Sequence, residues 1–256
     1  MIWTEGDVTG VTVTVPDQAS LLEDLGRHLE DGRGFSVATL NLDHVVKLAR
    51  NPLFRDAYGA QTHVTADGRP IVWLSRLAGQ DVGLVPGSEL IEPLVALVAR
   101  RGVPVAFYGA RDETLAAAAD ALGARYPELD VVFRRAPAMG FDPQGPQAQE
   151  DIKAIGASGA RVCFIALGAP KQEVFAACAS RALPQTGFVS IGAGLDFIAG
   201  TQTRAPAWVR RVSAEWLWRL LGNPGRLAGR YAACIAVMPQ MTLRALRIRR
   251  QGGSLS

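Results

Sequence analysis

The sequence predicts an α/β fold: a mostly parallel, Rossmann-like sheet with helices on both faces, followed by a basic helical appendage. Two observations predict the sheet. Strand-like and helix-like stretches alternate over residues 11–200, and most of the strand-like runs are continuously apolar, as in a parallel sheet covered on both faces. A third observation predicts the appendage, because the chain becomes rich in arginine and tryptophan after Gly200. We therefore expect an α/β domain over residues 1–200 and a helical appendage over residues 201–256.

Seven segments are predicted to be strands, because β-branched and aromatic residues are concentrated in them. They are residues 11–15, 35–40, 63–65, 103–109, 130–133, 161–168 and 187–194. The clearest helical patterns between them cover residues 87–102 and 113–127, and the second should end at Pro127. In the appendage, Pro224 and Pro239 are expected to divide the chain into two or three short helices, since proline interrupts helical hydrogen bonding.

The composition is typical of a cytoplasmic protein. The chain starts without the basic-then-apolar pattern of a secretory signal, and no run reaches the roughly 18 to 20 apolar residues of a membrane span. The cysteines and histidines are far apart in sequence, which predicts thiols in a reducing compartment and no zinc site. They are Cys163, Cys178, Cys234, His28, His44 and His63.

The charge is distributed unevenly along the chain. The net charge is only +3, but residues 201–256 carry ten arginines and a single acid. The first 200 residues carry 17 basic and 23 acidic side chains. A basic appendage on an acidic body predicts an anionic partner, which could be nucleic acid, a lipid surface or a phosphate group.

The stretch Gly-Ala-Pro-Lys-Gln-Glu, residues 168–173, is the strongest local sign of a ligand site. It follows an apolar strand-like run, and open α/β sheets bind ligands outside the carboxyl ends of their strands. Gly168, like Gly109 and residues 192–194 at two other strand ends, would let a ligand approach the backbone closely. Pro170 suits the first turn of a helix, where free amide groups favour a phosphate.

Within that predicted turn, Gln172 offers a donor and an acceptor, which suits the edge of a base or a sugar hydroxyl. These residues predict a nucleotide-type site. An ordinary capped helix with exposed polar side chains is an equally good interpretation of this stretch alone. The sequence contains neither a G-x-G-x-x-G fingerprint nor a phosphate-binding P-loop, so a standard dinucleotide or P-loop site is not predicted.

Seven segments occur in one order along the chain and carry a resemblance to a known family. They are residues 39–41, 66–73, 107–110, 168–173, 192–200, 204–208 and 215–231. In this order they resemble the WecG/TagA/CpsF family of bacterial glycosyltransferases (family 26), over roughly residues 35–240. The resemblance is specific because the whole ordered set is present.

The resemblance implies an inverting glycosyltransferase with an α/β catalytic domain. It would move a hexose, N-acetylhexosamine or uronic acid from a UDP-sugar to a polyprenyl-diphosphate-linked saccharide, in bacterial surface or exopolysaccharide biosynthesis. The family has no DxD-type metal site, so neither a metal nor a cofactor is implied. The chain would act peripherally on the anionic inner face of the cell membrane. The donor sugar, the acceptor and its linkage, and the oligomeric state stay open.

By resemblance, Asp67 is the base that takes the proton from the acceptor hydroxyl, and Thr39 and Asn41 position the sugars beside it. These residues also have a purely structural interpretation. Asp67 and Gly68 form a common turn pair that would cap a helix over residues 69–77. Thr39 and Asn41 would end a strand and cap the next helix, where Asn41 is a good N-cap.

Five further residues are predicted to contact the UDP-sugar. Gln172 and Asp196 match family positions near the nucleotide, and Phe141 would stack on the uracil ring. Gly109 and Gly168 would allow close approach to the backbone.

Arginines of the appendage are expected to neutralise the leaving diphosphate, since no metal-ligand set is evident. We expect Arg219 or Arg226 to close over the site and the other arginines to meet anionic lipid headgroups. Trp208, Trp216 and Trp218 would lie at the bilayer interface or pack against the domain. The sequence does not decide which arginines reach the site.

Two alternative classes fit the sequence less well. A nucleic-acid-binding α/β protein would use the basic appendage, but no recognised binding motif is present and the basic residues mingle with tryptophans, so no nucleic-acid partner is expected. A hydrolase or oxidoreductase would need a G-x-S-x-G elbow or a dinucleotide fingerprint, and the sequence has neither.

Overall fold

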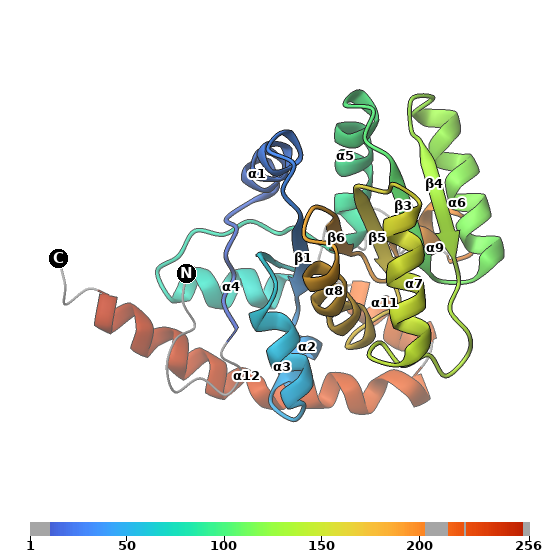
Figure 1. The fold of residues 1–256 in the computed structure, drawn as a ribbon. Helices are drawn as coiled ribbons and strands as arrows, with labels where there is room; N and C mark the ends of the chain where they lie inside the picture. The colour runs from blue at the N-terminus through green and yellow to red at the C-terminus, as the bar shows by residue number, and fades with distance from the viewer. Residues whose placement is uncertain (1–10, 203–214, 223, 253–256) are drawn as a thin grey trace.

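The computed structural model describes residues 11–202, 215–222 and 224–252 (Figure 1). Within these residues, six strands form one sheet in the order β2-β1-β6-β5-β3-β4, and every pair in it is parallel. The strands are β1 (Phe35–Leu40), β2 (His63–Ala66), β3 (Val105–Gly109), β4 (Val131–Arg135), β5 (Val162–Ala166) and β6 (Gly187–Ser190). The predicted α/β fold is confirmed.

Helices connect the strands and complete the fold. Before β5 they are α1 (Gln18–Glu30), α2 (Leu42–Leu48), α3 (Pro52–Gly59), α4 (Arg69–Leu77), α5 (Gly87–Arg100), α6 (Asp112–Arg125) and α7 (Pro146–Ala157). After it they are α8 (Lys171–Ala182), α9 (Gly194–Ile198), α11 (Glu215–Gly222) and α12 (Pro224–Gly252). The helix predicted over residues 113–127 ends at Arg125, just before the proline, as expected.

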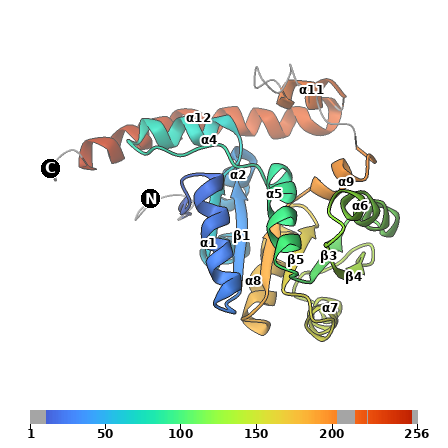
Figure 2. The ribbon, with the colours of Figure 1, turned by 90° about the horizontal axis from the view of Figure 1, so that it is seen from above.

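The two faces of the sheet bury different residues of the same strands, because successive side chains of a strand point to opposite faces. Phe107 and Phe164 pack into one core with α1, α5 and α6. Tyr108 and Ile165 pack into a second core with α7 and α8. Figure 2 shows these two helical layers on either side of the strands. The covering on both faces explains why the strands read as continuous apolar runs.

The segment of residues 11–15 is not a strand, so that prediction is wrong. It lies along the outer edge of β2, where the backbone amides of Thr14 and Val15 both donate to the carbonyl of Val64, at 2.9 and 3.3 Å. The amide of Val64 donates in return to the Thr14 hydroxyl oxygen at 2.8 Å. A side chain thus replaces a backbone ladder bond, and the segment covers the sheet edge without extending the sheet.

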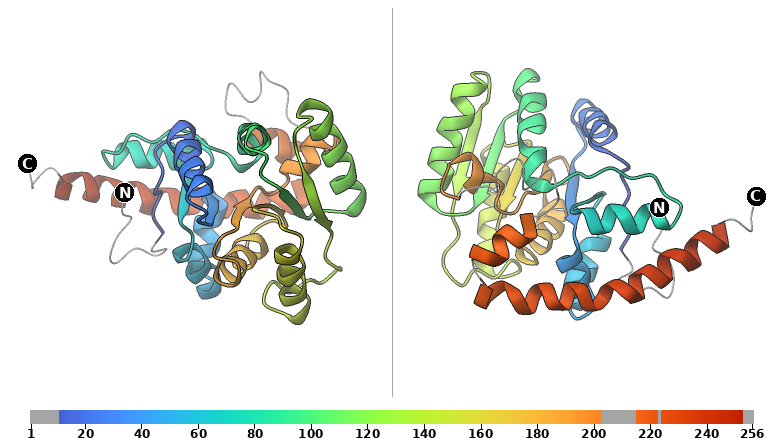
Figure 3. Two further views of the ribbon diagram at one scale, coloured as in Figure 1. Left: turned by 45° about the horizontal axis from the view of Figure 1, so that its top comes forward. Right: turned by 180° about the vertical axis from the view of Figure 1, so that it is seen from behind.

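The C-terminal helix α12 lies across the carboxyl edge of the sheet, beside α2 and α4 (Figure 3). Met241 and Ala245 of α12 are buried in a third core that contains Leu40 and Ala66, the last residues of β1 and β2. The appendage therefore packs directly over the strand ends where ligands of such sheets bind.

The predicted break at Pro239 does not occur. Residues 224–252 form one helix of 29 residues that contains Pro239. Proline removes one intrahelical hydrogen bond, but Cys234 on one side of it and Met241 on the other are both buried, so packing holds the two halves in line. Despite its length, α12 is too polar to cross a bilayer, and the same conclusion applies to every other helix in the described part of the chain.

Candidate functional site

The sheet has a topological switch point between β1 and β6 at its carboxyl edge. From β1 the chain turns toward β2 on one side. From β6 it turns to α9, which packs against α5 and α6 on the other side. Neighbouring strands whose connections leave in opposite directions open a crevice, and ligands of open α/β sheets bind there.

Asp67 and Asn41 meet at this edge. Asp67 follows β2, and its backbone amide donates to the carbonyl of Leu40 at 2.8 Å. The Nδ2 group of Asn41 donates to Oδ2 of Asp67 at 3.3 Å, and Oδ1 of Asn41 accepts from the amide of His44 at 3.0 Å. Asn41 thus caps α2, as its structural interpretation predicted, and also contacts the Asp67 carboxylate, whereas its positioning of the sugars stays a prediction.

The N-cap position of α4 falls one residue after Asp67. The cap position of α4 is Gly68, with φ +92°, and no side chain bonds to the first turn of this helix from that position. Glycine is suited to this backbone conformation. Contacts with Leu40 and Asn41 hold Asp67 at the strand end.

Thr39 is buried one strand position from the edge and is fixed by an internal polar chain. The Tyr58 hydroxyl donates to the Thr39 carbonyl at 3.0 Å and lies 2.7 Å from Nδ1 of His44. Since the single hydroxyl hydrogen goes to Thr39, Nδ1 of His44 donates to the Tyr58 oxygen. Burial lowers the pKa of His44 to about 3 and raises the pKa of Tyr58, so both side chains are neutral. This chain holds α2 and α3 against the end of β1.

Gln172 and Glu173 lie in the first turn of α8, as predicted, but both are buried. Nε2 of Gln172 donates to Oε1 of Glu173 at 2.9 Å, and Oε1 of Gln172 accepts from the amide of Gly192 at 3.1 Å. Gln172 therefore links the end of β5 to the loop after β6. Burial raises the pKa of Glu173 to about 7, so this carboxyl is largely protonated below neutral pH.

Sequence reasoning placed Glu173 in the first turn of a helix but gave it no role of its own and did not predict its burial. A signal was available in the pattern of α8. Phe175, Ala176 and Ala179 form a buried stripe, and Gln172 and Glu173 continue it toward the start of the helix at i−3 and i−4 positions.

The other predicted nucleotide residues lie near the carboxyl ends of β3, β5 and β6. Gly168 has φ +72° and Gly109 has φ +102°, a backbone region that favours glycine. A Cβ on Gly109 would lie 2.6 Å from the carbonyl oxygen of Ala166, so close strand packing also requires glycine there. Asp196 is half-buried in α9, and its Oδ1 accepts from the Thr201 hydroxyl at 3.3 Å.

Phe141 lies in the core that α7 and α8 form against one face of β3 and β5. Its ring contacts Tyr108 and Phe175, with centroid separations of 5.9 and 6.0 Å, and only 6% of the residue is exposed. The structure thus gives this ring a packing role. Stacking on uracil stays a prediction.

A cluster of three charges connects the appendage to the site. Arg230 of α12 lies 2.7 Å from Oδ1 of Asp43, and Lys47 lies 2.8 Å from its Oδ2. Lys47 also donates to the carbonyl of Ala169, next to the start of α8. Burial opposes ionisation of Asp43, but Lys47 and Arg230 together hold the pKa of its carboxyl below the usual range. Asp43 and Lys47 follow Asn41 on α2, so their contact with Arg230 docks α12 beside the Asn41–Asp67 pair.

The structure does not test the expectation for Arg219 and Arg226. Their backbones belong to α11 and α12, but their side chains lie outside the described residues, as do residues 203–214, which include Trp208, and the side chain of Trp216. The appendage arginine that the structure does place near the site is Arg230. Only the tertiary contact with Asp43 singles it out.

Comparison with known proteins gives one family. A model of the glycosyl transferase WecG/TagA/CpsF family matches residues 6–253. The N-acetylglucosaminyldiphosphoundecaprenol N-acetyl-beta-D-mannosaminyltransferase of Bacillus spizizenii is 26% identical over 201 residues, which cover 78% of this chain and 76% of that protein. The protein of the same name from Bacillus subtilis is 23% identical over 210 residues, which cover 81% and 79% of the two chains.

Proposed function

The chain belongs to the WecG/TagA/CpsF family of glycosyl transferases, and we propose that it moves a sugar from a UDP-sugar to a polyprenyl-diphosphate-linked saccharide. The observation that carries the proposal is the contact between Asn41 and Asp67 at the carboxyl edge of the sheet. The names of the two Bacillus relatives state a diphosphoundecaprenol-linked acceptor and an N-acetylmannosamine donor group, which supports this acceptor class.

In the proposed reaction, Asp67 is the general base. The acceptor hydroxyl oxygen attacks the anomeric carbon of the donor, the bond from that carbon to the UDP oxygen breaks, and the hydroxyl proton passes to the Asp67 carboxylate. Attack from the side opposite UDP inverts the anomeric configuration. Asn41 restricts rotation of the carboxylate by holding Oδ2, which keeps the base in place for the incoming hydroxyl.

Charge on the departing diphosphate has to be neutralised, and positive groups surround the start of α8. The first turn of α8 presents backbone amides at its N-terminus, which favour phosphate oxygens. Lys47 contacts Ala169 in the same loop, and Arg230 is held next to Lys47 through Asp43. We assign diphosphate stabilisation to this region, with Arg219 or Arg226 closing over it, and expect transfer without a metal or cofactor.

The outer surface of α12 suits an anionic membrane. Ile235, Leu243 and Leu246 are exposed apolar residues that share one side of the helix, apart from the buried stripe that packs on the body. Arg247 and Arg250 are exposed near them. Arginine close to an anionic bilayer contributes about 1 kcal/mol, and mixed apolar and basic side chains fit a lipid surface better than a nucleic-acid backbone. We therefore place the enzyme peripherally on the cytoplasmic face of the membrane.

Transfer by an Asp67→Asn variant tests the base. Radiolabelled UDP-N-acetylhexosamines, UDP-glucose and UDP-uronic acids are supplied with a diphosphate-linked lipid acceptor, in the presence of chelator. The asparagine variant should lose about 10²- to 10⁴-fold in turnover while its UDP affinity stays within about threefold. Asp56→Asn, which changes an exposed carboxylate on α3, is the matched control. Normal transfer by Asp67→Asn would exclude this mechanism.

A further inference from the structure

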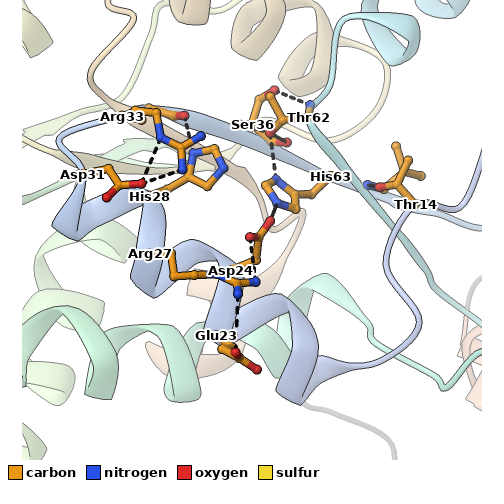
Figure 4. A network of polar contacts seen from close by, with 12 residues as sticks. Thr14, Glu23, Asp24, Arg27, His28, Asp31, Arg33, Ser36, Thr62 and His63 are labelled. Carbon is orange, nitrogen blue, oxygen red and sulfur yellow. Dashed lines mark hydrogen bonds and ion pairs between the residues drawn. The ribbon is translucent and has the colours of Figure 1, made fainter.

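Three potential metal ligands converge at the amino edge of the sheet, away from the site described above. Asp24 and His28 lie on α1, and His63 is the first residue of β2 (Figure 4). One ligand atom from each lies within 4.8 Å of the others, and no other such group of three occurs in the described part of the chain. His63 and Asp67 are separated by about 13 Å of strand, so this cluster is distinct from the proposed base.

The convergence comes from the fold and not from sequence spacing. Asp24 and His28 are four residues apart on one helix face, which brings their side chains together. α1 packs so that His63 reaches both, with Nε2 of His63 at 2.8 Å from Oδ2 of Asp24 and the two imidazole centroids 5.5 Å apart. The separation of 35 residues between the histidines gave no sequence signal of a zinc site.

Hydrogen bonds to the second ring nitrogens orient both histidines. Nδ1 of His28 lies 2.9 Å from the carbonyl oxygen of Gly34, which can only accept, so Nδ1 carries the hydrogen and Nε2 carries a lone pair. The Thr62 hydroxyl donates to the Ser36 carbonyl at 2.9 Å and lies 2.7 Å from Nδ1 of His63. In the tautomer where that hydroxyl accepts from Nδ1, Nε2 of His63 also presents a lone pair.

These hydrogen bonds bring two hydrogen-bond acceptors together, one on His63 and one on Asp24. In this tautomer a lone pair on Nε2 of His63 faces a carboxylate oxygen of Asp24 at 2.8 Å, and a shared cation, either a proton or a metal ion, holds the two atoms together. Histidines that bind metals characteristically donate their other ring nitrogen to a carbonyl or a similar acceptor, as both histidines do here.

We propose that Asp24, His28 and His63 bind a divalent transition-metal ion, for which Zn²⁺ is the best fit. Two imidazole nitrogens and one carboxylate oxygen form a common zinc ligand set, completed by water. The Asp24 side chain is 41% exposed, so solvent reaches the fourth position. Tetrahedral zinc spaces its ligand atoms by about 3.3 Å, which requires shifts of about 0.5 Å from the contact seen between His63 and Asp24.

The charged side chains next to Asp24 are compatible with a bound zinc ion. Arg27 lies 3.1 Å from Oδ1 of Asp24, but it also lies 3.5 Å from Glu23 and its side chain is 59% exposed, so it can keep that second partner when Asp24 turns to the metal. A bound ion would connect α1 to the edge strand β2. The inference concerns metal binding alone and does not depend on the proposed transfer reaction.

Zinc titration of the full chain tests the proposal. After removal of metals with chelator, calorimetric titration with ZnCl₂ should show one site, and zinc at one hundred times its dissociation constant should raise Tm by about 5–10 °C. Co²⁺ as a second probe should give the visible absorption of a four-coordinate site. His28→Gln and Asp24→Asn should each weaken zinc binding by at least about a hundredfold, more than the loss of an outer-shell partner costs.

Glu23→Gln is the matched control, because it changes a carboxylate on the same helix that also contacts Arg27 but is not one of the three ligands. It should bind zinc as the unmodified chain does. His28 is only half-buried, so His28→Gln is expected to fold, which its circular dichroism and cooperative thermal unfolding check. Equal zinc affinity for His28→Gln and the unmodified chain, or no saturable zinc binding at all, would overturn the proposal.

Discussion

Glu173→Gln should remove a loss of stability that accompanies rising pH, because Glu173 is fully buried with one carboxyl oxygen, Oε2, that has no hydrogen-bond partner within the described structure. Burial raises its pKa from 4.5 to about 7. Below pH 4.5 the folded and unfolded chains both hold the proton. Between the two pKa values only the folded chain keeps it, so stability falls as pH rises, and the loss is complete above the folded pKa.

The magnitude follows from the size of that shift. Each pKa unit corresponds to about 1.4 kcal/mol, so the free energy of unfolding should lose about 3 kcal/mol through this carboxyl between pH 4.5 and pH 8. Glutamine has the same shape and stays neutral, and its Oε1 can still accept from Gln172. The variant should therefore exceed the unmodified chain by less than about 1 kcal/mol at pH 5 and by up to about 3 kcal/mol at pH 8.

Urea unfolding at pH 5 and pH 8 measures this difference directly, and the comparison between variant and unmodified chain cancels the contributions of other titrating groups. Glu128→Gln, which changes an exposed carboxylate, is the control and should leave the pH dependence unchanged. If Glu173→Gln and the unmodified chain lost the same stability between the two pH values, the assignment of a buried, protonated Glu173 would be refuted.

Three other predictions follow from the contacts at the carboxyl edge. Gly109→Ala should lower the free energy of unfolding in urea by at least about 3 kcal/mol, because the added Cβ would clash with the Ala166 backbone at a positive φ. Gly102→Ala is also at a positive φ but has open space around it, so it should cost about 1 kcal/mol; equal losses for the two variants would contradict the packing argument. Arg230→Ala removes the partly exposed ion pair with Asp43, so the free energy of unfolding should fall by only about 0.5–1 kcal/mol. Proteolysis of α12 should accelerate, and an unchanged cleavage rate would show that this ion pair does not dock the helix. Anionic vesicles should retain the chain at physiological salt while duplex DNA does not, and the reverse result would favour nucleic-acid binding.

Local sequence patterns predicted several features of the fold correctly. Alternating apolar runs and helical patterns predicted the parallel sheet, since each strand and helix carries its own periodicity. Pro170 predicted the start of α8, and Asn41 predicted the cap of α2. Because the carboxyl ends of parallel strands meet at one edge, residues after separate strands could be expected to converge. The contact between Asn41 and Asp67 is consistent with that expectation.

Features that depend on long-range packing could not be predicted from local patterns. Phe141 stands in a loop beside a glycine and looks accessible in sequence, yet the rings of Tyr108 and Phe175 bury it. Pro239 looks like a helix end, but burial on both sides of it keeps α12 continuous.

The sequence by itself determined the class of fold and the family, and it predicted the edge of the sheet at which the site is expected, because these depend on periodicity and on ordered motifs along the chain. The tertiary structure decided which side chains are buried and which residues contact one another. It buried Glu173, paired Arg230 with Asp43, and brought His63 to Asp24 from a distant segment. The physical reason is that burial and charge pairing depend on which elements pack together, and the contacts between residues far apart in the chain exist only once the sheet has assembled.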